Sequence, residues 1–187
     1  MPPGKQVNQA SFASFSKDIA RISDLLRELD PLVKNFRHDD FGKIRELSSI
    51  HNLFVDSESQ IELVISACYS TPVFSIDESK AILDYVAQAS VAVQVLLNDV
   101  GLSRLEFDHA ILRVFSISPV IKGHIDKLDS LFSSLFVNLK NLLDASLVPS
   151  LENTASKIRS AFGIQATVVY SQVCSFHSPY KVSLIPS

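Results

Sequence analysis

Five histidines, at positions 38, 51, 109, 124 and 177, are the first candidates for metal binding or acid–base chemistry. They include no H-E-x-x-H motif and no pair four residues apart, the spacing that places two imidazoles of one helix on a zinc ion. The sequence also has no G-x-S-x-G elbow, no phosphate-binding loop and no G-x-G-x-x-G turn. We therefore expect no enzymatic activity, no metal and no cofactor.

The acidic residues and the two cysteines have structural explanations. Asp77, Glu78 and Asp84 fall near the start of a predicted helix, where acidic side chains favour the positive end of the helix dipole. Cys68 and Cys174 are too few for a disulfide framework and belong to no C-x-x-C motif. We expect Cys68 to be a small buried side chain and Cys174 a free thiol, with a bridge between them as the alternative.

The composition favours helices packed on helices. A chain of 187 residues suits one domain with a sizeable core, and its 47% hydrophobic residues supply the apolar surface. Only 5 glycines leave few tight turns for a β-sandwich. The net charge of −3, with 17 basic and 20 acidic residues interspersed, gives no continuous positive face for nucleic acid. Polar residues interrupt every apolar run, so we expect no membrane span, and we expect a monomer.

The best-marked helix is predicted between residues 71 and 101. Pro72 ends what precedes it, Ser75 and Glu78 form an S-x-x-E capping box, and Gly101 follows the last apolar residue as a helix stop. Apolar residues recur in alternating steps of four and three, which places on one face Ile82, Val86, Ala89, Val93, Leu97 and Val100. This stripe must face other helices.

Four further stretches show the same periodicity: residues 12–36, 41–69, 107–142 and 148–169. Pro31 lies inside the first and predicts a kink, with an early end at Asp30 as the alternative. The third crosses Ser118 and Pro119 in phase, so a kinked helix of about 40 residues competes with two helices joined at Ser118, and we favour the kink. We therefore predict an all-α fold: a single up-down bundle of about five long amphipathic helices over residues 11–171, after a polar lead-in at 1–10 and before an extended or disordered tail at 172–187.

The second stretch turns polar at two inward positions, His51 and Glu58. One interpretation is that the helix rotates or loosens near residues 55–59, so that Ile50 and Leu53 pack instead. The other is that these groups approach the polar end of a bound molecule, because a buried carboxylate without a partner is costly. We favour the first.

The inward stripes mix bulky side chains with the small residues Cys68, Ala89, Ala155 and Gly163. A bundle lined in this way either closes tightly or leaves an apolar hollow. Large empty cavities reduce stability in proportion to their volume, so a hollow would be expected to hold an apolar guest. From the residues alone, close packing is the simpler expectation.

Several segments resemble the fungal hydrophobic surface-binding and antigenic cell-wall galactomannoprotein family. Residues 74–82, FSIDESKAI, are similar to its F-S-x-x-E-S-x-x-I segment at the head of a central helix. Residues 18–25 match a D-I-x-x-I-S-x-L opening, a Pro119-Val-Ile segment precedes a run of leucines, and the closing stretch contains Ala161-Phe162 and Tyr170-Ser171. The resemblance covers about residues 18–171 and consists of helix-packing patterns rather than a catalytic signature.

The resemblance implies a non-enzymatic five-helix bundle that encloses a fatty-acid-like lipid or binds hydrophobic surfaces. It also implies a protein that is secreted or held in the cell wall. The N-terminal stretch shows no apolar segment of signal-peptide length, so an intracellular location is the alternative.

Candidate ligand-binding residues come from the inward stripes. An apolar tail would be held by Ile22, Leu26, Ile61, Ile65, Val86, Ala89, Val93, Phe132, Leu135, Ile158 and Phe162. A carboxylate would need polar groups at an end of the bundle or at His51, Ser57 or Ser66. The alternative function is a solid-core helical interaction or adhesion protein that recruits a partner protein without an internal ligand.

Overall fold

The computed structural model describes residues 12–36, 43–108 and 116–170, without the side chains of residues 43, 44 and 166–170. Five long α-helices carry the fold: α1 (Phe12–Asn35), α2 (Lys43–Cys68), α3 (Ile76–Leu102), α5 (Ser118–Lys140) and α6 (Val148–Tyr170). A short helix, α4 (Arg104–Asp108), follows α3, and a 3₁₀ turn, η1 (Ala145–Leu147), leads into α6. The described residues form no strand, so the all-α prediction is confirmed.

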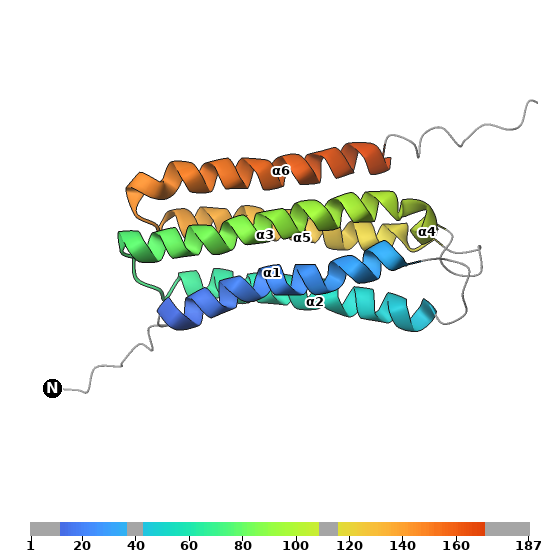
Figure 1. Cartoon of the computed structure of the whole chain (residues 1–187), viewed down its shortest axis with the longest axis horizontal. Coiled ribbons are helices and arrows are strands. Elements are labelled where there is room, and N and C mark those ends of the chain that lie inside the picture. Colours follow the sequence, from blue (N-terminus) through green and yellow to red (C-terminus); the bar gives the residue numbers. More distant parts are fainter. Residues whose placement is uncertain (1–11, 37–42, 109–115, 171–187) are drawn as a thin grey trace, which may run out of the picture.

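The long helices form a closed ring. Each packs against two others in the order α1, α2, α5, α6, α3 and back to α1, and the contact between α5 and α6 is the sparsest of the five. Successive helices run in alternating directions along the long axis of the molecule, which makes an up-down bundle (Figure 1). A ring of this kind gives every helix two neighbours, and the apolar stripe of each helix must serve both of them.

The predicted stripes form one core. It contains the buried apolar side chains of all five long helices together with Phe107 of α4 and Phe74 before α3. The central stripe of α3 is buried as expected from Ile82 to Val100. The core also includes Cys68, whose burial raises the pKa of its thiol to about 11. Cys174 lies outside the described residues.

Helix α3 is long and apolar enough to cross a membrane by length and composition alone. Its position in the ring, between α1 and α6, accounts for this composition, because both flanks of the helix pack on other helices. Its N-terminus carries the predicted capping box: the Glu78 amide donates to the Ser75 hydroxyl, and the Ser75 amide donates to the Glu78 carboxylate.

One predicted helix boundary was wrong and one alternative is excluded. Gly101 does not stop α3, which continues to Leu102 and has Ser103 as its C-cap. A Cβ on Gly101 would lie 2.8 Å from the Gln165 amide nitrogen of α6, so this glycine makes room for a side chain of a neighbouring helix. Pro31, in contrast, lies inside α1, which continues to Asn35 rather than ending at Asp30.

The expected kink at Pro119 is replaced by the start of a helix. Helix α4 ends at Asp108, residues 116 and 117 are not helical, and α5 begins at Ser118 with Pro119 in its first turn. The Ser118 hydroxyl donates to Asp108 over 2.5 Å instead of capping α5. Proline suits this place because the amide it lacks has no intrahelical partner in a first turn. The predicted lead-in at 1–10 and tail at 172–187 lie outside the described residues.

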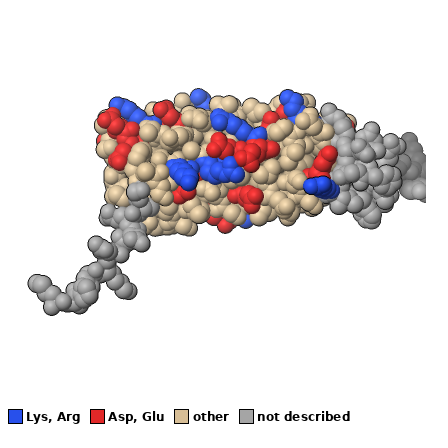
Figure 2. Space-filling view, turned by 60° about the horizontal axis from the view of Figure 1, so that its bottom comes forward, with Lys and Arg blue, Asp and Glu red and all other residues tan. Residues whose placement is uncertain are grey.

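The surface carries mixed charge. On the face shown in Figure 2, basic and acidic side chains are interspersed and separated by uncharged areas. Most ion pairs of the described residues lie at the surface, such as Arg21 with Glu28 at 2.6 Å. Exposed pairs of this kind contribute little to stability, about 1 kcal/mol or less.

Replacing Ser75 with Ala should lower the free energy of unfolding by about 1 kcal/mol, because the first turn of α3 loses its side-chain cap. The hydrogen bonds from Ser75 also lower the pKa of Glu78. A carboxyl group whose pKa is lower in the folded state than in the unfolded state stabilises the protein at pH values above its unfolded-state pKa. This stabilisation is lost as the pH falls through the folded-state pKa. Urea unfolding at pH 7 and pH 3.5 should therefore show a smaller difference between wild type and variant at the lower pH. An equal difference at both would contradict the proposed link to Glu78.

Candidate functional site

The apolar residues predicted to bind a ligand lie together in the core. Ile22, Leu26, Ile61, Val86, Ala89, Val93, Phe132, Leu135, Ile158 and Phe162 are buried, and Ile65 is half-buried against the same cluster. The structure thus brings residues of five helices together as the periodicity required. Their role as ligand contacts stays a prediction.

The polar residues predicted to bind a carboxylate are dispersed. His51 and Ser66 are exposed, and Ser57 is fully buried. The Ser57 hydroxyl donates to the Leu53 carbonyl oxygen of its own helix at 2.7 Å. A ligand carboxylate could use Ser57 only by breaking this bond, so the three residues do not form one ready-made polar site.

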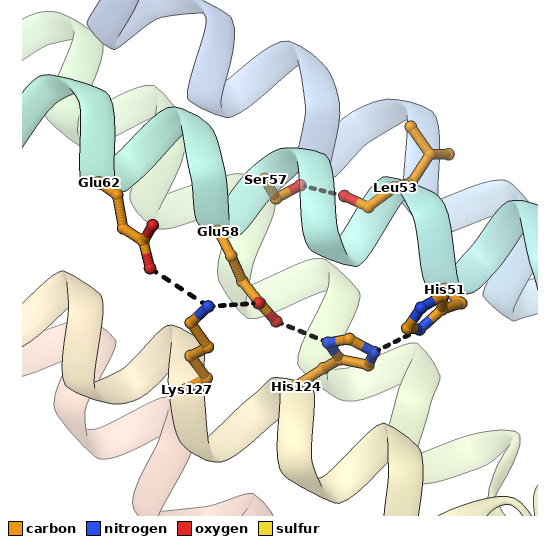
Figure 3. Close-up of polar contacts among 7 residues, drawn as sticks. All are labelled: His51, Leu53, Ser57, Glu58, Glu62, His124 and Lys127. Atoms are coloured by element: carbon orange, nitrogen blue, oxygen red, sulfur yellow. Dashed lines mark hydrogen bonds and ion pairs between the residues drawn. The ribbon is translucent and has the colours of Figure 1, made fainter.

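A polar network joins α2 and α5 at the place where the stripe of α2 turns polar (Figure 3). Glu58, 4% exposed, faces α5, where its Oε1 lies 2.6 Å from His124 Nδ1 and its Oε2 lies 3.0 Å from Lys127 Nζ. His124 Nε2 in turn lies 2.9 Å from His51 Nδ1. Lys127 also reaches Glu62 at 3.2 Å.

Each hydrogen bond of this network can have one donor and one acceptor. If His124 Nδ1 carries its hydrogen toward the carboxylate, Nε2 is free to accept from His51, and both rings can be neutral. The His124 ring stacks on Phe54, with centroids 4.8 Å apart and planes 5° from parallel. The bonds from Lys127 to the two glutamates raise the pKa of its amine. A carboxylate that would be costly alone is therefore fully partnered.

This network shows how α2 accommodates a polar residue in its inward stripe. Glu58 points inward as the register demands, and Ile50 packs in the core as the first interpretation expected. A contact of Glu58 or His51 with a bound molecule stays a prediction. The partner of the carboxylate is a pair of side chains from α5. Among the described residues, no group of three or more His, Cys, Asp or Glu side chains is placed to hold a metal ion. The contacts of Glu58 with His124 and Lys127 join α2 to α5.

A pocket opens where α3, α4, α5 and α6 meet. Its volume is about 70 Å³. The apolar part of its wall consists of Leu97, Val100, Phe107, Ile121, Ile125 and Phe162, and the polar part of Arg104, Ser118, Lys122, Asp126, Asp129 and Gln165. Phe162 is the one residue that this pocket shares with the predicted set.

The charges at the pocket already have partners. Arg104 Nε lies 3.5 Å from Asp108 Oδ2, and Lys122 pairs with Asp126 one turn along α5. Burial raises the pKa of Asp129, Arg159 opposes this shift and Asp126 adds to it. Gln165 differs from these groups: its Oε1 is buried and has no hydrogen-bond partner among the described residues.

Sequence reasoning missed this pocket because its wall comes from helix ends. The short helix α4 contributes Phe107 and Arg104 to the wall, and the sequence predicted a break in this stretch only as the alternative to a kink at Pro119. Gly101 was noticed as a helix stop. Its role against Gln165 depends on α6, which lies more than sixty residues away along the chain and cannot be seen from local pattern.

A pair of carboxyl groups lies between α1 and α3. Asp99 is 6% exposed and pairs with Lys34 at 3.9 Å. Burial, followed by the charge of Asp99 and a hydrogen bond to it, raises the pKa of Asp30, while Lys34 opposes the shift. Oδ1 of Asp30 has no hydrogen-bond partner within the described part of the chain. Two acidic groups this close disfavour each other's charge.

Solved structures share this fold. Afmp4p in complex with palmitic acid matches with a TM-score of 0.77 at 15% identity, over 84% of this chain and 99% of that one. Ligand binding domain 1 of Penicillium marneffei MP1 protein, complexed with arachidonic acids, matches with a TM-score of 0.72 at 10% identity, over 84% and 98%. The chain has the fold of these domains. Domain 2 of the same protein, also with arachidonic acids, matches at 0.73 and 10%, over 86% and 97%.

The resemblance inferred from the F-S-x-x-E-S segment is thereby confirmed as a likeness of fold. No family model matches the sequence, and no curated protein matches it. At 10–15% identity the likeness lies in helix order and packing. It assigns no individual residue.

Replacing His124 with Ala should lower the free energy of unfolding by about 2 kcal/mol, because Glu58 keeps only Lys127 and Phe54 loses its stacked ring. Lys127 to Ala is the matched control on the same helix; half of its side chain is exposed, so about 1 kcal/mol or less is expected. Urea unfolding of both variants measures this. Equal losses would show that His124 is no better coupled than a surface cation.

Replacing Asp30 with Asn should raise the melting temperature at pH 7 by about 3 °C, because Asp99 loses a neighbouring negative charge. The raised folded-state pKa of Asp30 means that its ionisation opposes folding at pH values above it. The advantage of the variant should therefore shrink as pH falls through that value. Asp56 to Asn on the exposed face of α2 is the control, with no change expected in the same thermal scans.

Proposed function

We propose that this protein is a non-enzymatic lipid carrier or sensor that holds a single-chain lipid, such as a fatty acid, between its helices. The observation that carries the proposal is the shared fold with Afmp4p and both MP1 domains, whose structures contain palmitic or arachidonic acid. The pocket between α3, α4, α5 and α6 supports it, because six apolar side chains line it.

To bind a long acyl chain, the bundle must widen. The pocket measures about 70 Å³, less than the roughly 150 Å³ of an apolar cavity that accepts benzene, and a long acyl chain is several times larger than benzene. The seam between α5 and α6 is the sparsest of the ring, and the pocket lies along it. Separation at this seam would join the pocket to the core around Phe132 and Ile158.

A solid-core interaction protein is the second candidate. It is favoured by the close packing of the predicted ligand residues, and by exposed apolar side chains on the outer face of α3, where Val91 and Val95 lie one turn apart with 60% and 45% exposed. A partner protein or a hydrophobic surface would then cover this face.

If the first candidate is right, we also propose that the protein is secreted or held in the cell wall, because its fold is like that of the fungal domains. Fractionation of the cells that make the protein tests this location.

Native mass spectrometry of the purified protein, followed by lipid extraction, separates the two candidates. The first predicts an adduct of lipid mass, its loss on delipidation, and a higher melting temperature when palmitic acid is added back. Absence of any adduct, together with an unchanged melting temperature after addition, would favour the solid-core candidate.

A pocket-filling variant tests where the lipid enters. Ile125 to Trp should weaken palmitic acid binding about tenfold, because the indole occupies the pocket that the acyl chain needs. Val137 to Trp adds the same ring to an exposed position of the same helix and should bind like wild type. Isothermal titration measures both, and circular dichroism confirms that both are folded. Equal affinities would place the lipid elsewhere in the bundle.

A further inference from the structure

We propose that the polar end of the pocket selects a lipid with an uncharged hydrogen-bond donor, a primary alcohol, over one with an ionised carboxylate. This inference rests on the proposed lipid-binding function and specifies the chemistry of the head group that the site accepts. Its central residue is Gln165 of α6, which the predicted set did not contain.

Gln165 carries a buried oxygen without a partner. Its side chain is among those that line the pocket, and its Oε1 is buried and has no hydrogen-bond partner among the described residues. Buried polar atoms in folded proteins are nearly always paired, and the few exceptions call for an explanation. A carbonyl oxygen accepts hydrogen bonds and cannot donate them, so the group that completes it must bring an N–H or O–H.

The Gln165 side chain packs against α3. The Gln165 amide lies over Gly101 of α3, close enough that a Cβ there would come within 2.8 Å of Nε2 and 2.9 Å of Oε1. Glycine inside a helix costs stability relative to alanine. Here it lets the Gln165 amide lie between α3 and α6, beside the pocket that this residue lines.

The charged side chains that line the pocket balance one another. Two cations, Arg104 and Lys122, line the pocket, and each already has a carboxylate partner, Asp108 and Asp126 respectively. Asp126 and Asp129 line it as well, so the formal charges of the wall cancel. A carboxylate ligand would compete with these acidic partners for the two cations and would face Asp126 and Asp129.

A hydroxyl meets none of these difficulties. Its O–H can donate to Gln165 Oε1, and its oxygen can accept from a group of the rim, while the first carbons of the chain contact Leu97, Val100 and Phe162. The small volume of the pocket suits a head group and the start of a chain. The remaining chain would extend along the α5–α6 seam described above.

Equimolar competition in native mass spectrometry at pH 8 tests the proposal with three ligands of equal chain length. We expect 1-hexadecanol to be bound about five- to tenfold more than methyl palmitate, which lacks a donor, and more than palmitate, which is charged. Palmitate as the preferred ligand would overturn the proposal. So would equal binding of the alcohol and the ester.

Gln165 to Leu removes the acceptor without changing the size of the side chain much. The preference for 1-hexadecanol over methyl palmitate should disappear, while ester binding stays as in wild type. Gln94 to Leu makes the same change outside the pocket and should keep the preference. If Gln165 to Leu fails to fold, Gly101 to Ala displaces the amide from α3 and should abolish the same preference. A preference that survives in these pocket variants would overturn the proposal.

The failures of the two proposals are distinguishable. If no lipid binds at all, the lipid-binding function is wrong and this inference falls with it. If all three ligands bind without discrimination, lipid binding stands and the role of Gln165 is refuted.

Discussion

The structure depends on the closure of a five-helix ring. A helix in a ring must bury two flanks, so its apolar stripe has to be wide, and one polar residue in the wrong place must find a partner on the adjacent helix. Helix α1 packs against both α2 and α3 through large interfaces, and α5 packs against α6 through a sparser one. The interface between α5 and α6 is thus the most sparsely packed of the ring, and the pocket lies beside it.

The two ends of the bundle are finished differently. At one end, the Phe74 amide donates to the Leu142 carbonyl oxygen at 2.8 Å, and the Asp144 amide donates to the buried hydroxyl of Ser79 at 3.0 Å. At the other end, α4 is inserted between α3 and α5, where Phe107 stacks on Phe36 with ring centroids 5.2 Å apart. The first end is held by hydrogen bonds from two backbone amides. The second end combines the stacked rings with a hydrogen bond from the Ile117 amide to the Phe107 carbonyl oxygen at 3.0 Å, and the pocket lies beside it.

The buried polar groups divide into partnered and unpartnered ones. Glu58 has two partners on α5, and its pairing sets the register between α2 and α5, because a shift of one turn would leave the carboxylate buried without them. Gln165, which lines the pocket, and Asp30, between α1 and α3, each have a buried oxygen without a partner in the described part of the chain. A site that binds a ligand is expected to keep such a group, since the free energy of the missing bond is recovered when the ligand supplies it.

Sequence alone determined the helices with strong periodicity and marked ends. The capping box at Ser75 and Glu78 begins α3, the stripe from Ile82 to Val100 is buried, and α1 continues through Pro31, because local hydrogen bonding and side-chain spacing act within one helix. The break before Pro119 was predicted only as the alternative to a kink, because the apolar periodicity continues in phase across Ser118 and Pro119. Tertiary structure decided the partner of Glu58, the purpose of Gly101 and the place of the pocket. Each of these depends on which helices become neighbours, and α2, α3, α5 and α6 meet only when the ring closes.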